Sequence, residues 1–169
     1  QRATFQMLLM ELYFDQQQFE QAEDFARELL EMSFEDDNSA GYYRKERAYS
    51  IIGNSLIQRK DYKAASEILA VGLQRYPNSG ESANSAFSRA FADFNRGEYE
   101  KAADGFAFYV KTYSSDRNAV HGQYYLAHSY QMQTNFAQAA VAFKDLAENF
   151  PNANYSEEAM FLVGENNYN

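Results

Sequence analysis

Residues 62–65 read Tyr-Lys-Ala-Ala, and this pattern, an aromatic residue followed three positions later by alanine, decides the fold. The pattern returns at residues 19–22, 99–102 and 136–139, so consecutive copies start 43, 37 and 37 residues apart. Fourteen residues after three of these starts stands a second aromatic residue, at Tyr76, Tyr113 and Phe150. Self-similarity at a nearly fixed period of this length indicates a repeat protein.

Each copy opens a segment with the apolar spacing of an α-helix. In the second copy Tyr62, Ala65, Leu69 and Leu73 fall on one helical face, and another apolar helical stripe precedes each copy. Proline or a cluster of Ser, Asp and Asn closes the segments, as at helix ends. We therefore predict an all-α fold, one array of helical hairpins over residues 1–169, with hairpins at about 3–35, 40–79, 81–116 and 118–153 and a partial fifth at 155–169.

Two places depart from the regular pattern. The first spacing is six residues longer than the others, and the surplus lies between Phe34 and Tyr43. We expect either a longer loop there or an N-terminal extension of the next helix. The turn before Tyr99 reads one residue shorter than its counterparts, which leaves the register of the third hairpin open.

Composition and charge exclude several classes of function. The chain of 169 residues is 46% hydrophobic and 23% charged, and it has no cysteine, so disulfides and thiol chemistry are absent. Its net charge is −9, and residues 1–37 hold 10 acidic and 2 basic residues. That surplus is either a solvated helix face or an acidic patch for a basic partner or neighbouring domain. We expect no nucleic-acid binding, because the only dense basic cluster, Arg44, Lys45 and Arg47, stands next to acidic Glu46. We expect no direct membrane insertion, because no apolar run approaches about 20 residues.

The sequence offers no catalytic or metal-binding constellation. His121 and His128 are seven residues apart, whereas a helical metal pair needs a spacing of four. There is no glycine-rich phosphate loop and no Gly-x-Ser-x-Gly elbow. We therefore predict no metal, no cofactor and no enzymatic activity.

The repeats resemble the tetratricopeptide repeat (TPR), whose consensus places aromatic residues, Leu-Gly, Ala and Pro at fixed offsets. The second copy carries the resemblance best, with Tyr49, Gly53, Ala65 and Pro77 at those offsets. The resemblance implies a right-handed superhelical solenoid of helical hairpins. The period of 37 and the Tyr-Pro-Asn-Ser stretch at 76–79 are similar to repeats of bacterial outer-membrane-barrel assembly lipoproteins and of the Tol-Pal-associated periplasmic coordinator. This narrower likeness implies a periplasmic or outer-membrane-associated protein, with a cytoplasmic location as the alternative.

The resemblance also implies where a partner would bind. In TPR arrays the first helices of successive hairpins line a concave groove. By that register the groove side carries five candidate partner-binding residues: Ser50, Asn54, Tyr124, His128 and Phe161. Tyr124 lies off the core stripe, so we expect its truncation to weaken binding and to change stability little.

In the third hairpin two registers fit the groove. One places Phe87 and Phe91 there, and the other places Ser88 and Ala92 there. We favour the second register, because the first would bury charged residues of the same helix.

A scaffold or adaptor that binds a protein or peptide segment in this groove is the function that the resemblance implies. One alternative is a self-assembly module that forms homo-oligomers. The other is a regulatory arm of an enzyme whose catalytic domain lies outside these residues.

Overall fold

The structure, a computed structural model, describes residues 2–32 and 39–168, and within these ranges it contains helices and no strands. The all-α prediction is confirmed. The helices are α1 (Arg2–Asp15), α2 (Phe19–Glu31), α3 (Ser39–Gln58), α4 (Tyr62–Arg75), α5 (Ser82–Asn95), α6 (Tyr99–Thr112), α7 (Ala119–Met132), α8 (Phe136–Asn149) and α9 (Ser156–Tyr168).

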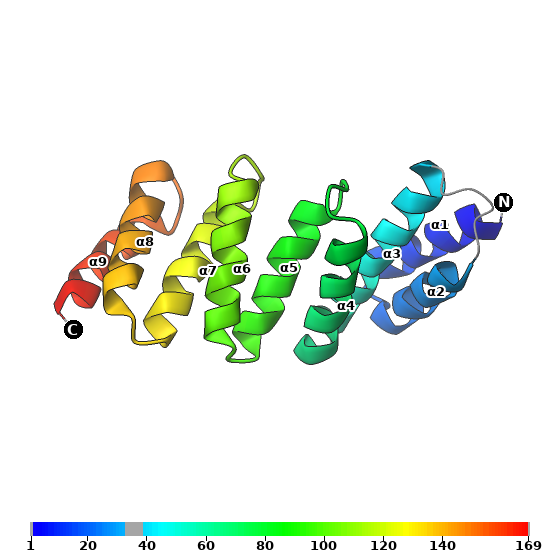
Figure 1. The fold of residues 1–169 in the computed structure, drawn as a ribbon, viewed down its shortest axis with the longest axis horizontal. Helices are drawn as coiled ribbons and strands as arrows, with labels where there is room; N and C mark the ends of the chain where they lie inside the picture. Colours follow the sequence, from blue (N-terminus) through cyan, green and yellow to red (C-terminus); the bar gives the residue numbers. More distant parts are fainter. Residues whose placement is uncertain (1, 33–38, 169) are drawn as a thin grey trace. The chain divides into compact units, whose positions relative to one another are not determined.

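The chain divides into two compact units, Gln1–Ala92 and Asp93–Asn169, with the boundary inside α5. In unit 1, α1 packs on α2, α2 on α3 and α3 on α4, and α1 also contacts α3. In unit 2, α6 packs on α7, α7 on α8 and α8 on α9. Figure 1 shows these neighbours in sequence order within each unit. Each unit is thus a stack in which a helix contacts the helices next to it in the chain, as in repeat proteins.

The turns inside the hairpins share one backbone conformation. Among the described residues, four have positive φ, and each stands two residues before the aromatic that opens the second helix: Gln17 (60°), Lys60 (62°), Gly97 (77°) and Thr134 (59°). Only the third turn supplies glycine, the residue that adopts this conformation without strain. Three residues separate the two helices in every one of these hairpins. The expectation of a shorter third turn is therefore wrong.

The extra residues of the first spacing lengthen a helix. Helix α3 has 20 residues, whereas α5 and α7 have 14 each. This confirms the N-terminal extension that was one of two expected outcomes. The six additional residues of α3 equal the whole surplus of the first spacing. The end of the predicted first hairpin falls on residues 33–38, which lie outside the described residues.

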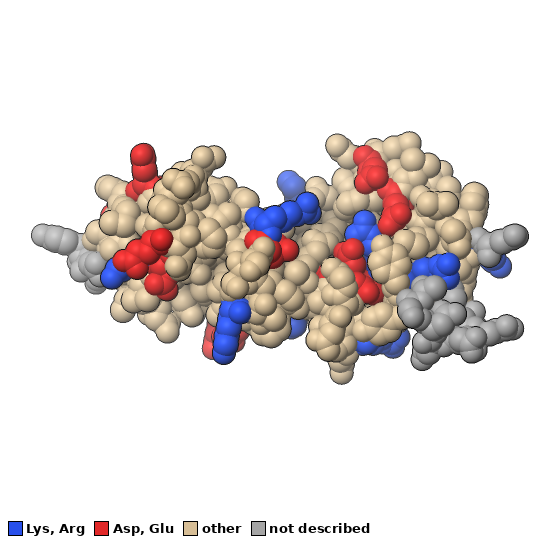
Figure 2. Space-filling model, turned by 90° about the horizontal axis from the view of Figure 1, so that it is seen from above, with Lys and Arg blue, Asp and Glu red and all other residues tan. Residues whose placement is uncertain are grey.

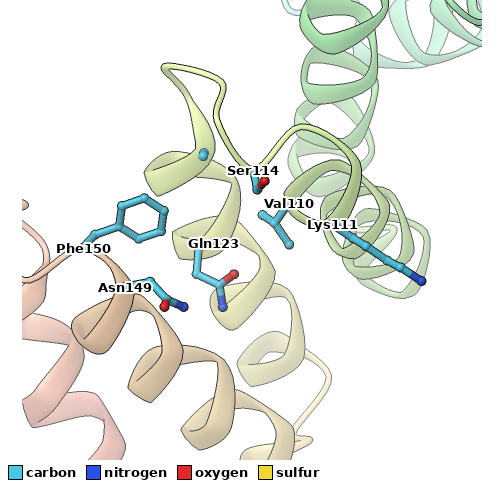
Figure 3. A pocket seen from close by; sticks show the side chains of 7 residues that line it. Val110, Lys111, Ser114, Gln123, Asn149 and Phe150 are labelled. Atoms are coloured by element: carbon cyan, nitrogen blue, oxygen red, sulfur yellow. The ribbon is translucent and has the colours of Figure 1, made fainter.

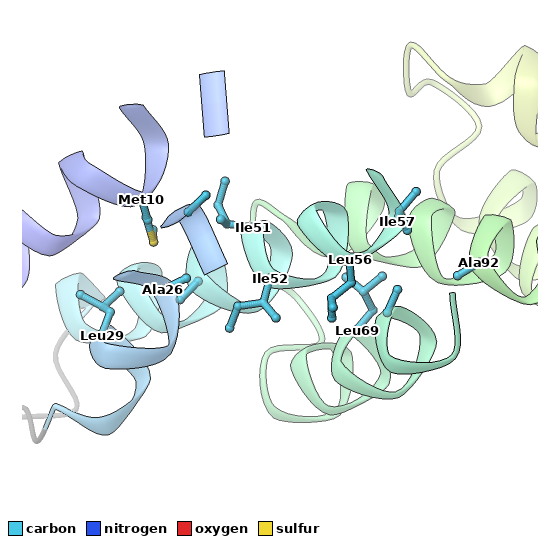
Figure 4. Close-up of a cluster of buried hydrophobic side chains, with 12 residues drawn as sticks. Met10, Ala26, Leu29, Ile51, Ile52, Leu56, Ile57, Leu69 and Ala92 are labelled. Carbon is cyan, nitrogen blue, oxygen red and sulfur yellow. The ribbon is translucent and has the colours of Figure 1, made fainter. Parts of the chain in front are cut away.

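The core of unit 1 is a cluster of aliphatic side chains contributed by α1 to α5, from Met10 to Ala92 (Figure 4). Gly53 lets α3 approach α4 closely. A Cβ atom built on Gly53 would lie 2.3 Å from Cγ of Leu69, whose side chain is fully buried. A Cβ on Gly72 of α4 would likewise lie 2.8 Å from Cβ of Tyr49 on α3. Each helix of this hairpin therefore uses a glycine to accommodate a large residue of the other.

The core of unit 2 is built around aromatic residues. Phe106, Tyr109 and Phe143 are fully buried, and Phe106 stacks on Tyr125 with 5.5 Å between ring centroids. The small residues of the repeat pattern are also fully buried, as the pattern predicts: Ala22, Ala65, Ala102 and Ala139.

The loops between hairpins are fixed in two ways. Six residues separate α4 from α5, α6 from α7, and α8 from α9. In the first and last of these loops, the hydroxyl groups of Ser82 and Ser156 donate to the carbonyl oxygens of Tyr76 and Phe150. The middle loop has Ala119 at the equivalent position, and there Oδ1 of Asp116 accepts hydrogen bonds from the Tyr109 hydroxyl (2.5 Å) and from the Asn118 N–H (2.8 Å).

The hydrogen bond from Tyr109 to Asp116 makes the stability of the middle loop depend on pH. Burial raises the pKa of the Asp116 carboxyl, but the hydrogen bonds from Tyr109 and Asn118 outweigh it and hold the pKa below its ordinary value. The carboxylate therefore stabilises the fold fully above the unfolded pKa of about 4, and this contribution is lost as pH falls through the lower folded value. We expect Tyr109→Phe to reduce the free energy of unfolding by about 1–3 kcal/mol at neutral pH and by less in acid, measured by urea denaturation.

Ser82→Ala is the matched control for this prediction. It removes a loop bond between neutral groups, so its cost of about 1 kcal/mol is expected to stay the same across this pH range. An equal pH dependence of the two variants would contradict a role for the Asp116 carboxylate.

Candidate functional site

The structure gives the five candidate residues equivalent places in their hairpins but divides them between the units. Ser50 and Asn54 lie on α3 in unit 1, and Tyr124 and His128 lie on α7 in unit 2, 12 and 8 residues before the aromatic that opens the next helix. Phe161 follows Tyr124 by one period of 37 residues, on α9. The two groups are therefore described as separate surfaces.

In unit 1 the candidate residues form a closed polar network. The side-chain amide of Asn54 donates to the Ser50 carbonyl oxygen (2.9 Å), and Asn84 donates to Oγ of Ser50 (3.0 Å). Oγ of Ser88 donates to Oδ1 of Asn54 (2.8 Å). Ser50 is only 1% exposed. These side chains hold α3 against the adjoining part of α5, and little of Ser50 is left for a partner.

The third hairpin follows the register that the sequence analysis did not favour. Phe87 and Phe91 stand 12 and 8 residues before Tyr99, as Ser50 and Asn54 stand before Tyr62. Their half-buried rings are stacked, with centroids 6.4 Å apart and an interplanar angle of 10°. Counting back from the helix-opening aromatic would have found this pair.

The favoured register places Ala92 on the groove side, but Ala92 is fully buried. The charge argument behind it fails as well. Asp93 is in fact buried, at 3% exposure, and Nη1 of Arg96 lies 3.3 Å from its Oδ1. A buried carboxylate with a charged partner is tolerated where an unpaired one is not.

In unit 2, Tyr124 and His128 belong to an aromatic cluster that includes the residue before α9. The Tyr124 ring centroid lies 4.3 Å from that of His128 and 4.6 Å from that of Tyr155. His128 packs edge-on against the buried Phe143 at 5.0 Å. Tyr124 is half-buried by these contacts, so truncating it removes packing as well as contact surface, contrary to the expectation of little effect on stability.

Two imidazole nitrogens of this region are buried without a hydrogen-bond partner among the described residues, Nδ1 of His121 and Nε2 of His128. The ring of His121 lies 5.6 Å from that of Tyr155. Burial lowers the pKa of His128, although Gln131 and Glu158 act in the opposite direction, so its imidazole is neutral at pH 7. Burial, and next the charge of Glu158, raise the pKa of Tyr124. We call His121, Tyr124, His128, Tyr155 and Glu158 the Tyr124 cluster.

Phe161 stands on α9 one turn beyond Glu158 and is 67% exposed. Residues three apart on a helix are neighbours on its surface. The carboxylate of Glu158 and the apolar ring of Phe161 therefore border the same stretch of α9, and the charge of Glu158 lies close enough to Tyr124 to raise the pKa of that residue. The repeat offsets mark Phe161, but no repeat offset marks Tyr155 or Glu158, so the sequence pattern does not predict these two residues.

Part of the acidic surplus of the first hairpin is compensated within unit 1. Arg59 pairs with Glu23 (2.8 Å), and Arg47 binds both Glu11 (3.1 Å) and Glu81 (2.8 Å). On the face seen in Figure 2, basic and acidic side chains of the described residues are interspersed. The carboxylate of Glu23 is itself buried, at 8% exposure, so it needs its charged partner, whereas the part-exposed pair of Arg47 with Glu11 contributes about 0–1 kcal/mol.

Unit 2 has a hollow of about 710 Å³ beside α8 and α9, lined by residues that include Lys144, Glu148, Glu157 and Met160. Another of about 430 Å³ lies in unit 2 between the ends of α6 and α8 and the start of α7, lined by residues that include Val110, Lys111, Gln123 and Phe150 (Figure 3). Gln123 donates to the carbonyl oxygen of Ala142, and the Lys111 side chain points away from Gln123 and Phe150. Within the described residues, no three His, Cys, Asp or Glu side chains are grouped to hold a metal ion. No helix of the described ranges has the length and apolar character needed to cross a bilayer.

Solved structures with the same fold are TPR proteins. The apo form of RapI superposes with a TM-score of 0.78 at 19% identity over 97% of this chain, and this chain spans 62% of that one. MamA (41-end) from Desulfovibrio magneticus RS-1 gives a TM-score of 0.75 at 13% identity, covering 98% of this chain and 93% of that one. A Podosopora anserina putative kinesin light chain with TPR-like repeats gives 0.72 at 12% identity, covering 98% and 84%.

These likenesses establish the TPR solenoid fold that the sequence predicts. The comparison with curated protein sequences gave no match. A family profile described as "YfiO: Outer membrane lipoprotein" matches residues 42–167, the greater part of the chain. Together with the TPR fold, this match shows that the chain belongs to the YfiO outer membrane lipoprotein family.

Proposed function

We propose that this protein is a non-enzymatic scaffold of the bacterial envelope that binds an extended segment of another protein. The Tyr124 cluster is the observation that carries the proposal. It combines half-buried aromatic rings, two buried imidazole nitrogens without partners and the exposed Phe161 nearby. Aromatic side chains give a large contact area at a small cost in conformational entropy, and they dominate the energetics of protein interfaces.

The family supports the proposed location. Membership in a family of outer membrane lipoproteins supports a periplasmic, outer-membrane-associated protein. TPR families are mostly scaffolds, which supports a binding role over a catalytic one.

Site-specific photo-crosslinking tests the proposal with matched positions. The photoreactive p-benzoylphenylalanine replaces either Phe161, 67% exposed on α9, or Phe108, 55% exposed on α6. We expect position 161 to give one discrete adduct with another protein in the envelope fraction of the producing cells, and position 108 to give none. Adding Tyr124→Ala to the position-161 variant is expected to reduce the adduct at least fivefold, because an aromatic anchor contributes more than 1 kcal/mol.

The alternative outcomes separate the competing functions. Equal adducts at both positions, or none at position 161, would contradict the proposed surface. A cross-linked dimer of the chain would instead favour self-assembly. That second function has one observation behind it, an exposed apolar stripe on α1 formed by Phe5, Leu8 and Leu12.

A further inference from the structure

The Tyr124 cluster has the chemistry of a cation site. The rings of Tyr124 and Tyr155 lie 4.6 Å apart at an angle of 35°, and both are half-buried, so part of each ring meets solvent. The negative face of an aromatic ring attracts a positive charge placed over it. Glu158 follows Tyr155 by three residues and is exposed, and it makes no ion pair with any described residue. An aromatic surface and an uncompensated carboxylate thus stand side by side.

The neighbouring histidine does not offset this negative character. Nδ1 of His128 lies 3.1 Å from Oε1 of Gln131. An amide oxygen can only accept, so Nδ1 carries the proton and Nε2 carries a lone pair. Burial keeps the ring neutral at pH 7. The local sequence points the same way, because residues 149–169 contain three glutamates and no Lys or Arg.

We infer that the Tyr124 cluster binds an arginine side chain of the partner segment, stacked on Tyr124 and Tyr155 and paired with Glu158. This inference rests on the proposed peptide-binding function. A guanidinium is planar and always charged, so it can stack on a ring and bind a carboxylate at the same time. A carboxylate in the same place would face Glu158 with no positive charge to offset the repulsion.

The spacing along α9 adds a second feature of the partner. Residues three apart on a helix have Cβ atoms about 5–6 Å apart, which describes Glu158 and Phe161. In an extended segment, side chains two residues apart lie on one side, about 6.6 Å from each other. An arginine over Glu158 therefore places an apolar side chain, two residues along the segment, against the exposed Phe161.

A peptide titration tests the inference. The probes are acetyl-Ser-X-Ser-Leu-Ser-amide peptides in which X is Arg, Lys, Gln or Glu, added to the whole chain at low ionic strength and followed by NMR. We expect the Arg peptide to shift the resonances of Tyr124, Tyr155 and Glu158 and to bind about 5- to 10-fold more tightly than the Gln peptide. The Lys peptide is expected to fall between them, and the Glu peptide to bind most weakly.

Two neighbouring glutamates supply the matched variants. Glu157 and Glu158 are both exposed in the first turn of α9. Glu158→Gln is expected to remove most of the preference for Arg over Gln, whereas Glu157→Gln keeps it. Both variants should lower the melting temperature slightly and to the same extent, because both carboxylates lie in the first turn of α9, where a negative charge interacts favourably with the helix dipole.

The results separate this inference from the proposed function. If the Gln or Glu peptide binds at the cluster as tightly as the Arg peptide, the arginine inference fails and the peptide-binding surface stands. If no peptide shifts these resonances at millimolar concentration, the inference also fails, and the proposed function is then judged by the cross-link at position 161. Equal losses in Glu157→Gln and Glu158→Gln would show a general charge effect and overturn the specific pairing with Glu158.

Discussion

Replacing Phe106 by alanine is expected to reduce the free energy of unfolding by about 3–5 kcal/mol. The Phe106 side chain is fully buried in α6 and stacks on Tyr125, with ring centroids 5.5 Å apart and an interplanar angle of 15°. Its loss removes the burial of a large apolar surface and leaves a cavity that the packed helices can fill only in part. Urea denaturation followed by circular dichroism measures the effect.

Phe108 is the matched control on the same helix. It is 55% exposed and lies only two residues from Phe106. Phe108→Ala is expected to change the stability by less than about 1 kcal/mol, since most of the ring stays in water in both states. If Phe106→Ala does not fold, Phe106→Leu with a smaller loss replaces it. Equal effects at positions 106 and 108 would contradict the orientation of α6.

Gly53→Ala is expected to destabilise the protein, although alanine favours a helix over glycine by about 1 kcal/mol. The added Cβ would lie 2.3–2.9 Å from three side-chain atoms of Leu69, which is fully buried and cannot move into solvent. Overpacking of this kind costs about 1–3 kcal/mol. The net loss in a denaturation experiment shows that the contact between α3 and α4 outweighs helix propensity.

Gly164→Ala, in contrast to Gly53→Ala, is expected to stabilise the protein. Gly164 lies in helix α9, and a Cβ built there meets no atom within 4 Å. The gain in helix propensity is then unopposed, and we expect an increase in stability of up to about 1 kcal/mol. The double variant Gly53→Ala/Leu69→Ala should lose less stability than the sum of the losses of the two single variants, because shortening the side chain at position 69 makes room for the Cβ atom added at position 53. Additive losses would contradict the close approach at Gly53.

The internal repeat predicted which residues occupy equivalent positions in the candidate site, but it did not predict which side chains they contact. Ser50, Tyr124, Phe161 and, in the register not favoured, Phe87 stand at one offset of the repeat, so their equivalence is visible without a structure. What each position does depends on its neighbours. Oγ of Ser50 accepts a hydrogen bond from Asn84, 34 residues away in the chain, whereas the ring of Tyr124 contacts the ring of Tyr155, 31 residues away. Such partners are distant in the chain, and the repeat pattern does not encode which side chains meet.

The sequence by itself determined the helices, the hairpins and the small buried positions such as Ala65, Ala102 and Ala139. Helical periodicity and close packing between helices are local and repeated requirements, so they leave a pattern in the chain. Only the tertiary structure decided that Asp93 is buried, where its pairing with Arg96 makes the charge tolerable. It also decided that Tyr155 and Glu158 join Tyr124, because packing sets contacts between residues distant in the chain.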